Sequence, residues 1–493
     1  MRNTNEKCGT GIPGLDSVLG GGLPRNRLYL VDGNPGVGKT TLALQFLLEG
    51  VRLGEKCLYV TLSESKPELE SVALSHGWSL SDVSIIELSA IERSLAGKSR
   101  NTMFQSAEVE LTALSTLLME TIESVRPKRV VLDSLSEMRL LAQNPLRYRR
   151  QILAFKQRLA ERDCTVLLLD DRSAVGADVQ VQSIVHGLIS LTMAPLKYGI
   201  FRRSLSVMKL RAVRFREGAH DYVIRQGGLQ VYPRLVAAEH HTTFEKTLSS
   251  SGDADLDSLV GGGLHSGTSN LLMGPAGSGK STLASMFAHA AAARGERVNY
   301  YAFDESLHLL RDRARELHLD FEPHVRSGML NVKQIDPAEI APGELAHEIL
   351  REVSVNKTKM VVLDSLNGYV NAMPNEEFLN LHLHELLSYL NKQGVVTIMI
   401  LAQHGLLGPI GAPVDISYLA DTVVLTRFFE AGGAVKKAIS VMKKRSGAHE
   451  MSIRELSMAN GRVAIGEPLS QFEGVLTGVP RPLGGYAMRP GGA

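Results

Sequence analysis

The chain alternates short apolar runs with segments that have the pattern of a helix. In the first half, the runs short enough for single strands are residues 27–31, 56–62, 130–132 and 165–169. Lys39–Leu53 has the pattern of a helix and is followed by Gly54, a typical helix terminator. Strands of consecutive Val, Ile and Leu are buried on both faces, which is typical of a parallel sheet covered by helices. The pattern therefore predicts an α/β fold.

This pattern occurs twice in the chain. Gly20–Leu23 returns as Gly261–Leu264, and Gly38–Lys39 returns as Gly279–Lys280, each 241 residues later. Val131–Leu135 also returns, but 231 residues later. The first half therefore carries ten more residues between Glu64 and Asp133 than the second half carries between Glu305 and Asp364. The corresponding strands of the second half are predicted at residues 269–273, 298–303, 360–363 and 395–401, with a helix at 280–294. An ordered internal repeat of this kind predicts two domains of the same fold.

Two changes in composition indicate the domain boundaries. Residues 237–243 have no apolar periodicity, and Ser249–Asp253 is rich in turn-forming residues. From Pro468 onward the chain contains much Gly and Pro and few charges. We therefore expect a first domain at residues 1–240, a second domain at 241–468, and a short irregular C-terminal tail at 469–493.

Composition narrows the functional classes. Of the 493 residues, 44% are hydrophobic and 22% are charged, which excludes wholesale disorder. Lys and Arg number 54 against 52 Asp and Glu, a balance that disfavours a general binder of nucleic acids. The three cysteines form no CxxC pair, and no apolar run approaches a membrane span of roughly 20 residues. We therefore expect a cytoplasmic protein with reduced thiols and no membrane segment.

Each half contains a glycine-rich phosphate loop. Gly33–Thr40 and Gly274–Ser281 both fit GxxxxGK[ST], and each follows a predicted strand and opens a predicted helix. Glycine lets backbone N–H groups converge on phosphate oxygens, and the helix N-terminus adds partial positive charge. Lys39 and Lys280 are expected to reach the β- and γ-phosphates of ATP. Two such loops in register predict two ATP sites.

Both the phosphates and a magnesium ion have predicted ligands. The residues predicted to contact ATP are Gly33, Pro35, Gly36, Gly38, Lys39, Thr40, Thr41, Gly274, Gly277, Ser278, Gly279, Lys280, Ser281 and Thr282. Thr40 and Ser281 are expected to place hydroxyls on Mg²⁺, assisted by Asp133 and Asp364, which end apolar strands. An acid at a strand end is commonly only a polar cap, but its repetition beside both loops favours the magnesium site.

Candidate catalytic carboxylates follow the strand after each loop helix. Hydrolysis needs a group that orients and deprotonates water near the γ-phosphate, and a carboxylate suits that task. Glu64 in the first half and Glu305 in the second are expected at the ends of their strands. Asp304 precedes Glu305, and adjacent residues of a strand point to opposite faces, so one acid is expected to act and the other to tune it.

These motifs together resemble the KaiC family of bacterial clock-type ATPases. The phrase at Gly11–Leu23 and its partial copy at Leu256–Leu264 carry the resemblance with the two loops, and it covers residues 8–465. It implies two tandem RecA-like P-loop NTPase domains, each a mostly parallel sheet covered by helices. It also implies a homohexamer in which the ATP of one subunit is contacted by the neighbouring subunit's Lys209, Arg211, Lys443 and Arg445. Without the resemblance, such strand-end cations are expected to face solvent.

The same resemblance implies autophosphorylation in the second domain. Clock-type members of the family phosphorylate an adjacent Ser-Thr pair, and the matching residues here are Ser417 and Tyr418. Ser417 is therefore the candidate acceptor, while a phenol stands where the threonine would be. Clock-type or histidine-kinase signalling partners are expected on the same basis.

Two alternatives use the same fold. A RecA- or RadA-like DNA-dependent ATPase needs basic loops, but residues 170–178 are not basic and residues 404–415 contain no Lys or Arg. Nucleic acid is therefore not the expected partner. The other alternative is a signalling scaffold that binds ATP mainly in order to assemble. The retained lysines and acids favour hydrolysis over that alternative.

Overall fold

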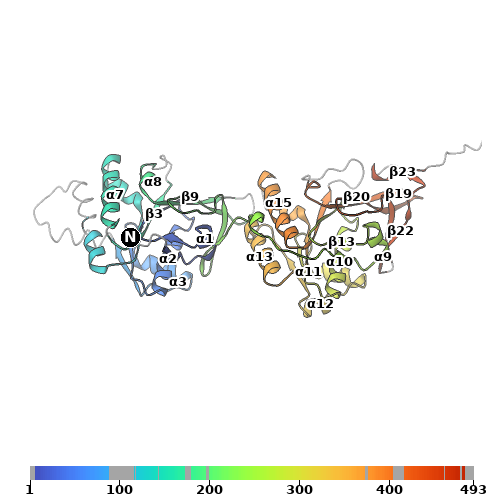
Figure 1. Ribbon diagram of the computed structural model, residues 1–493, viewed down its shortest axis with the longest axis horizontal. Coiled ribbons are helices and arrows are strands. Elements are labelled where there is room, and N and C mark those ends of the chain that lie inside the picture. The colour runs from blue at the N-terminus through green and yellow to red at the C-terminus, as the bar shows by residue number, and fades with distance from the viewer. Residues whose placement is uncertain are drawn as a thin grey trace, which may run out of the picture. The chain divides into compact units, whose positions relative to one another are not determined.

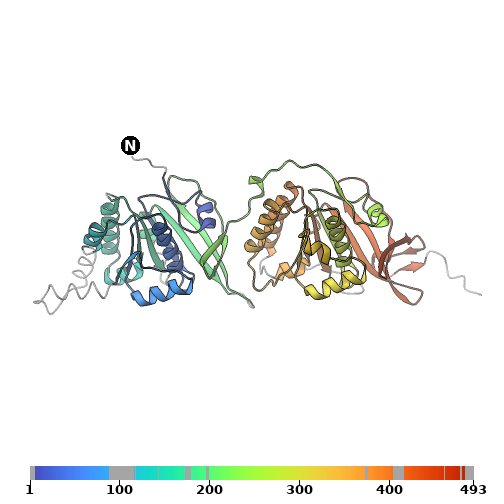
Figure 2. The same cartoon turned by 90° about the horizontal axis from the view of Figure 1, so that it is seen from below.

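Two compact units, Met1–Arg234 and Leu235–Ala493, make up the computed structural model of the chain. The structure describes residues 6–87, 116, 118–142, 144–160, 162–172, 179–195, 199–371, 376–403, 416–459, 461–477 and 480–482. Each unit contains one nine-stranded sheet with helices on both faces, and the two units resemble each other closely in the ribbon views (Figure 1, Figure 2).

The sheet of the first unit has the order β11-β10-β9-β8-β3-β7-β6-β4-β5. Its strands are β3 (Leu28–Gly33), β4 (Cys57–Thr61), β5 (Val83–Glu87), β6 (Arg129–Asp133), β7 (Thr165–Asp171), β8 (Gly187–Ala194), β9 (Arg202–Leu210), β10 (His220–Arg225) and β11 (Gly228–Tyr232). Strands β8 to β5 in this order are parallel, and β9 to β11 continue the sheet antiparallel. The described helices are α1 (Pro13–Val18), α2 (Lys39–Arg52), α3 (Lys66–Ser75), α6 (Leu135–Ala142), α7 (Pro145–Ala160) and α8 (Val179–Ile184). The short strands β1 (Lys7–Cys8) and β2 (Leu23–Pro24), which flank α1, form a separate antiparallel pair.

The second unit repeats this topology in the order β16-β15-β17-β18-β14-β19-β20-β21-β22. Its strands are β14 (Ser269–Pro275), β15 (Val298–Ala302), β16 (Leu330–Gln334), β17 (Met360–Asp364), β18 (Val396–Gln403), β19 (Thr422–Ala431), β20 (Ala434–Lys444), β21 (Arg454–Ala459) and β22 (Arg462–Pro468). The helices are α9 (Ala254–Leu259), α10 (Lys280–Ala293), α11 (Leu307–Glu316), α12 (Glu322–Arg326), α13 (Pro342–Ser354), α14 (Leu366–Asn371) and α15 (Glu376–Lys392). The short antiparallel strands β12 (Leu248–Ser249) and β13 (Leu264–His265) repeat the pair formed by β1 and β2 in the first unit.

Apolar layers cover both faces of each sheet, as the strand composition predicts. In β3, Tyr29 and Val31 belong to the layer under α2, whereas Leu28 and Leu30 belong to the layer under α7. Burying both faces removes a large apolar area from water and requires helices on either side. The predicted α/β fold with two mostly parallel sheets is therefore confirmed. The loop helices begin where predicted, at Lys39 and Lys280.

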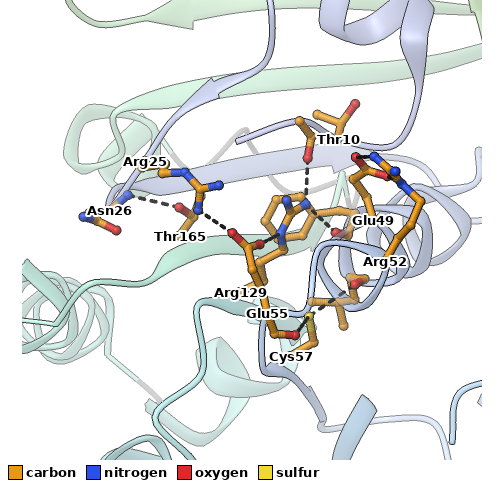
Figure 3. A network of polar contacts seen from close by, with 12 residues as sticks. Thr10, Arg25, Asn26, Glu49, Arg52, Glu55, Cys57, Arg129 and Thr165 are labelled. Atoms are coloured by element: carbon orange, nitrogen blue, oxygen red, sulfur yellow. Dashed lines mark hydrogen bonds and ion pairs between the residues drawn. The ribbon is translucent and has the colours of Figure 1, made fainter. Parts of the chain in front are cut away.

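A buried arginine distinguishes the first unit from the second. Arg129 is fully buried on β6, and its Nε donates to the Glu55 carboxylate at 2.5 Å, while Nη1 donates to the Phe46 carbonyl at 2.7 Å (Figure 3). Glu55 also accepts from Arg25 at 2.6 Å. The Arg129 guanidinium therefore links β6 directly to α2, and it links β6 through Glu55 and Arg25 to the segment before β3. Met360 holds the same register on β17, so the second unit has an apolar side chain there.

The described part of the tail is irregular apart from β23 (Phe472–Glu473), β24 (Arg481–Pro482) and a 3-10 turn at Val475–Thr477. Leu469 and Val475 are buried against Phe429 and Ala438, so the start of the tail packs on β19 and β20. Among the helices that the structure describes, none is long and apolar enough to cross a membrane.

Candidate ATP sites

Glycines in left-handed conformation lead into both loop helices. Gly38 has φ +97° and Gly279 has φ +104°. A Cβ at Gly38 would lie 2.5 Å from Ile224 Cδ1, and a Cβ at Gly279 would lie 2.0 Å from Met458 Cε. Both the backbone conformation and the close packing therefore require glycine. The turn directs the first backbone N–H groups of α2 and α10 toward the space above each loop.

The lysine of the first loop is buried and bound on three sides. Lys39 Nζ donates to the carbonyl oxygens of Gly33 at 2.8 Å and Asn34 at 3.2 Å. It also forms an ion pair of 2.6 Å with Asp171 Oδ1 at the end of β7. The ammonium group is thus held over the loop, where it can pair with phosphate oxygens.

Within the part of the chain that the structure describes, the lysine of the second loop forms no ion pair of this kind. Lys280 Nζ donates to the carbonyl oxygens of Gly274 at 2.9 Å and Pro275 at 2.6 Å. Ala402 holds the register that Asp171 holds in the first unit. Burial lowers the pKa of Lys280 to about 8, and Asp364 opposes that shift only in part. Proton loss from Lys280 therefore begins near neutral pH.

The other predicted ATP contacts lie on the same loops. Gly36 and Gly277 also have positive φ, and no atom outside the neighbouring residues lies within 4 Å of a Cβ built on Gly36. Pro35 is exposed beside Gly36. Thr41 and Thr282 are buried in the first turns of α2 and α10, and Ser278 Oγ donates to the Pro275 carbonyl at 2.8 Å.

The strand-end acids lie beside the loop hydroxyls, as the sequence predicts. Asp133 Oδ2 accepts from Thr40 Oγ1 at 3.3 Å, and Asp364 is hydrogen-bonded to the side chain of Ser281. In both units a buried tyrosine also donates to the acid. Tyr59 donates to Asp133 at 2.6 Å and Tyr300 donates to Asp364 at 2.6 Å. The sequence reading missed these tyrosines, although they stand 241 residues apart and the repeat offset would have found them.

These oxygens form a fitting site for Mg²⁺. Burial raises the pKa of both Asp133 and Asp364, and hydrogen bonds from the tyrosine and the loop hydroxyl oppose that rise. Within the described residues, no three His, Cys, Asp or Glu side chains cluster as a metal site. Mg²⁺ commonly uses one carboxylate together with a hydroxyl, waters and substrate phosphates, and the chain offers that set twice.

The candidate catalytic acids lie in bends beyond their strands, since β4 ends at Thr61 and β15 ends at Ala302. The prediction that the acids end these strands was therefore wrong by two or three residues. The Thr61 hydroxyl accepts from the Glu64 backbone N–H at 2.9 Å and donates to the Glu64 carbonyl at 2.7 Å, which fixes the bend.

The two glutamates have different surroundings. Burial raises the pKa of Glu64, and the nearby Asp133 raises it further. Glu305, in contrast, accepts from Arg313 Nη1 with both carboxylate oxygens at 2.6 Å. Val72 stands 241 residues before Arg313, so the first unit has no arginine at that position. Asp304 does not point away from the site region, because it accepts a hydrogen bond from Ser365, which follows Asp364.

The four predicted cross-subunit cations lie at the opposite edge of their sheets. Lys209 Nζ donates to the Gln182 carbonyl at 2.7 Å, and Arg211 Nη2 donates to the Ser183 carbonyl at 3.0 Å. In the second unit, Lys443 Nζ donates to the carbonyl oxygens of Ser417 and Ala420, and Arg445 Nη2 donates to that of Tyr418. Each pair therefore holds the turn or helix that precedes β8 or β19.

The candidate acceptor Ser417 is half-buried in this turn, and the Tyr418 side chain is exposed. The prediction that DNA is not a partner rests in part on residues 173–178 and 404–415. These residues lie outside the described part of the chain. The same holds for residues 483–493 of the tail.

Two phosphate loops on two RecA-like sheets define a tandem P-loop ATPase. The family model for the KaiC ATPase matches residues 8–236 and 250–470. The chain belongs to the KaiC ATPase family.

The chain is also similar to curated circadian clock proteins. It is 27% identical to the circadian clock oscillator protein KaiC of Acaryochloris marina, over 96% of this chain and 90% of that protein. It is 28% identical to the circadian clock protein KaiC2 of a Synechocystis strain, over 96% of this chain and 84% of that protein. It is 27% identical to KaiC3 of the same strain, over 96% and 94%. These relatives do not favour the alternative of a DNA-dependent ATPase.

Proposed function

We propose that both units hydrolyse Mg-ATP with a glutamate as the base. One observation carries the proposal: each unit places a loop lysine, a loop hydroxyl, a strand-end aspartate and a glutamate at the same edge of its sheet. The backbone N–H groups and Lys39 or Lys280 offset phosphate charge, which is the main requirement of phosphoryl transfer. Glu64 and Glu305 orient a water molecule and accept its proton.

Magnesium fits the oxygen pairs of both units. Thr40 and Asp133 hold it in the first unit, and Ser281 and Asp364 hold it in the second. When bound, it neutralises charge on the β- and γ-phosphates of ATP. The tyrosines fix the orientation of the two aspartates by hydrogen bonds of 2.6 Å, which leaves the other carboxylate oxygen for the metal or its water shell.

We further propose a homohexamer with ATP at the subunit interfaces. Lys443 and Arg445 lie near the start of β14, whereas the second loop lies at its end. Five residues of strand separate Ser269 from Gly274, roughly 17 Å. These cations therefore cannot serve the loop of their own unit and suit the ATP of a neighbouring subunit. The same reasoning applies to Lys209 and Arg211 in the first unit.

The second unit is proposed to transfer phosphate to Ser417. The Ser417 carbonyl is bonded by Lys443, so the acceptor lies at the same edge as the cross-subunit cations. A donor on a neighbouring subunit satisfies this geometry, whereas the subunit's own ATP does not. The relatives named circadian clock proteins support a clock-type signalling role, with clock-type or histidine-kinase partners.

Phosphosite mapping after incubation with Mg-ATP tests the transfer. We expect phosphate on Ser417 in the unaltered protein, and no phosphate in the second unit of the Ser417→Ala variant. Lys280→Ala is the matched control, because it removes the donor nucleotide and leaves the acceptor intact. Phosphate on Tyr418 alone, or none on either residue of the unaltered protein, would contradict the proposed acceptor.

A further inference from the structure

A basic cavity lies at the edge of the first unit's sheet that is remote from its phosphate loop. Its volume is about 350 Å³, and its lining includes Arg27, Lys156, His186 and Arg211. None of the described residues that line it is Asp or Glu. Arg27 precedes β3, Lys156 is on α7, and His186 and Arg211 lie at the ends of β8 and β9. Helix α7, which carries Lys156 and Leu159 of the lining, packs against α8 (Figure 1).

Three cations of this cavity donate hydrogen bonds to backbone carbonyls. Lys156 Nζ donates to the Ile184 carbonyl at 2.6 Å, Arg211 Nη2 to that of Ser183 at 3.0 Å, and Arg27 Nη1 to that of Arg211 at 3.1 Å. Carbonyl oxygens satisfy donors but supply no negative charge.

The lowered pKa values of His186 and Lys156 agree with a local excess of positive charge. Burial, together with the charges of Lys156, Arg27 and Arg211, lowers the pKa of His186 to about 4. Burial and Arg211 also lower the pKa of Lys156. His186 is therefore neutral at pH 7. Its Nδ1 accepts from the Leu28 N–H at 3.2 Å, so Nε2 carries the proton and is a donor.

The second unit provides an internal comparison. His186 corresponds to Asp421, because Asp421 Oδ2 accepts from the Ser269 N–H at 3.0 Å just as His186 accepts from Leu28. Asp421 also pairs with Arg445 at 3.4 Å, and Arg445 is the counterpart of Arg211. The second unit thus neutralises this arginine with its own carboxylate, whereas the first unit has a neutral imidazole in that place.

At two further positions the first unit has a cationic side chain where the second unit has an uncharged one. Arg27 corresponds to Thr268, since the carbonyls of both accept from the second residues of the neighbouring strands β7 and β18. Lys156 corresponds to Leu387 at the 231-residue offset of this region. Relative to the second unit, the first has therefore lost one negative charge and gained two positive charges around a single cavity.

We propose that this cavity binds a phosphate-class anion. Arg27, Lys156 and Arg211 supply the charge, and the Nε2–H of His186 supplies a neutral hydrogen bond. The anion is either a free phosphate compound or the polyphosphate of a neighbouring subunit's nucleotide. Only the second source rests on the proposed hexamer.

Pyrophosphate binding tests the cavity directly. The background is the Lys39→Ala, Lys280→Ala chain, in which both loops have lost the lysine that holds phosphate. Titration calorimetry compares this chain with one that also carries Arg27→Thr, Lys156→Leu and His186→Asp. Each substitution installs the residue that the second unit already has at that register. We expect pyrophosphate affinity to fall at least tenfold, and not to change with Arg150→Gln, which removes an exposed charge from the same helix.

The source of the anion follows from a second measurement. The same three substitutions are placed in a chain with intact loops, and its size in saturating Mg-ATP is compared with that of the unaltered protein. Loss of assembly assigns the anion to the neighbouring nucleotide, whereas weaker pyrophosphate binding with unchanged assembly assigns it to a free compound. Unchanged pyrophosphate binding together with unchanged assembly overturns the proposal. If the unaltered protein does not assemble at all, the hexamer fails and the calorimetry still decides the cavity.

Discussion

At the residue scale, the two ATP sites share their framework and differ in charge pairing. The first unit pairs its loop lysine with Asp171 and has Val72 at the position of the arginine that pairs with Glu305. The second unit does the reverse, because Lys280 has no acid at that register and Glu305 is held by Arg313. We therefore expect the two sites to differ in pH dependence and in rate.

Nucleotide affinity of the second site should fall as pH rises. A Lys280 pKa of about 8 means that binding phosphate requires proton uptake above that pH. In a Lys39→Ala chain, which isolates the second site, the affinity for ATP should fall about tenfold between pH 7 and pH 9. Fluorescent-nucleotide titration measures this, and a flat profile over that range would contradict the assignment.

Releasing Glu305 should accelerate the second site. Arg313→Val installs the residue of the first unit and removes the ion pair that holds both carboxylate oxygens. Because a free carboxylate accepts a proton more readily, we expect hydrolysis in the Lys39→Ala background to rise severalfold. Arg315→Val, on the same helix and more exposed, is the control and should leave the rate unchanged. A lower rate for Arg313→Val would mean that the arginine serves the reaction.

Sequence reasoning proposed most of the candidate site residues that both copies retain, but it missed Tyr59 and Tyr300. The loops, Asp133, Asp364 and the two glutamates follow from motifs and their repetition. Asp171 and Arg313 could not be found in this way, because each occurs in one copy only and its contact depends on how strands and helices pack. The remaining error, the placement of the glutamates on strands, arose because apolar runs do not show where a strand bends.

At the element scale, the four central parallel strands of each sheet were predicted, whereas the flanking parallel strands β5, β8, β16 and β19 and the antiparallel strands were not. The centres of β3 and β6, residues 28–31 and 130–132, consist of apolar residues that are buried. Strand β9 is covered less completely and contains Arg202, Arg203 and Lys209, so its composition gives no comparable signal. The same is true of β20 with its four lysines. The sheet therefore extends beyond the edge that hydrophobicity indicates.

The buried Arg129 should be essential to the first unit. Arg129→Met copies Met360 of β17 but leaves the half-buried Glu55 with only Arg25 as an ion-pair partner among the described residues, so we expect the free energy of unfolding to fall by about 3 kcal/mol. Trp78, the only tryptophan of the chain, lies in the first unit and reports its unfolding by fluorescence in urea. Arg52→Gln, which breaks only an exposed pair, should cost less than about 1 kcal/mol. Equal effects of the two substitutions would refute the role given to Arg129.

At the scale of the whole molecule, the repeat explains the size of the chain. The 493 residues form two compact units of similar topology, and the near balance of charge coexists with local clusters of basic residues. Those clusters lie at the edges of the sheets remote from the loops, in places where they cannot serve the ATP of their own unit. We therefore expect complete ATP sites only in an assembly.

Mg-ATP should therefore drive assembly. Nucleotide that bridges subunits stabilises the ring by mass action, so the hexamer should predominate at saturating Mg-ATP and decline when nucleotide is removed. Light scattering coupled to size-exclusion chromatography measures the mass. The Lys39→Ala, Lys280→Ala chain is the control and should remain smaller. A monomer of the unaltered protein at saturating Mg-ATP would remove the role of the four cross-subunit cations.

The rate of ATP hydrolysis in glutamate variants tests the account most directly. Glu64→Gln and Glu305→Gln preserve shape and remove the base, so each should abolish the contribution of its own unit. The double variant should lose at least about 100-fold in rate while its affinity for ATP remains unchanged. A double variant that binds ATP and hydrolyses it at the unaltered rate would contradict the claim that these two carboxylates are the bases.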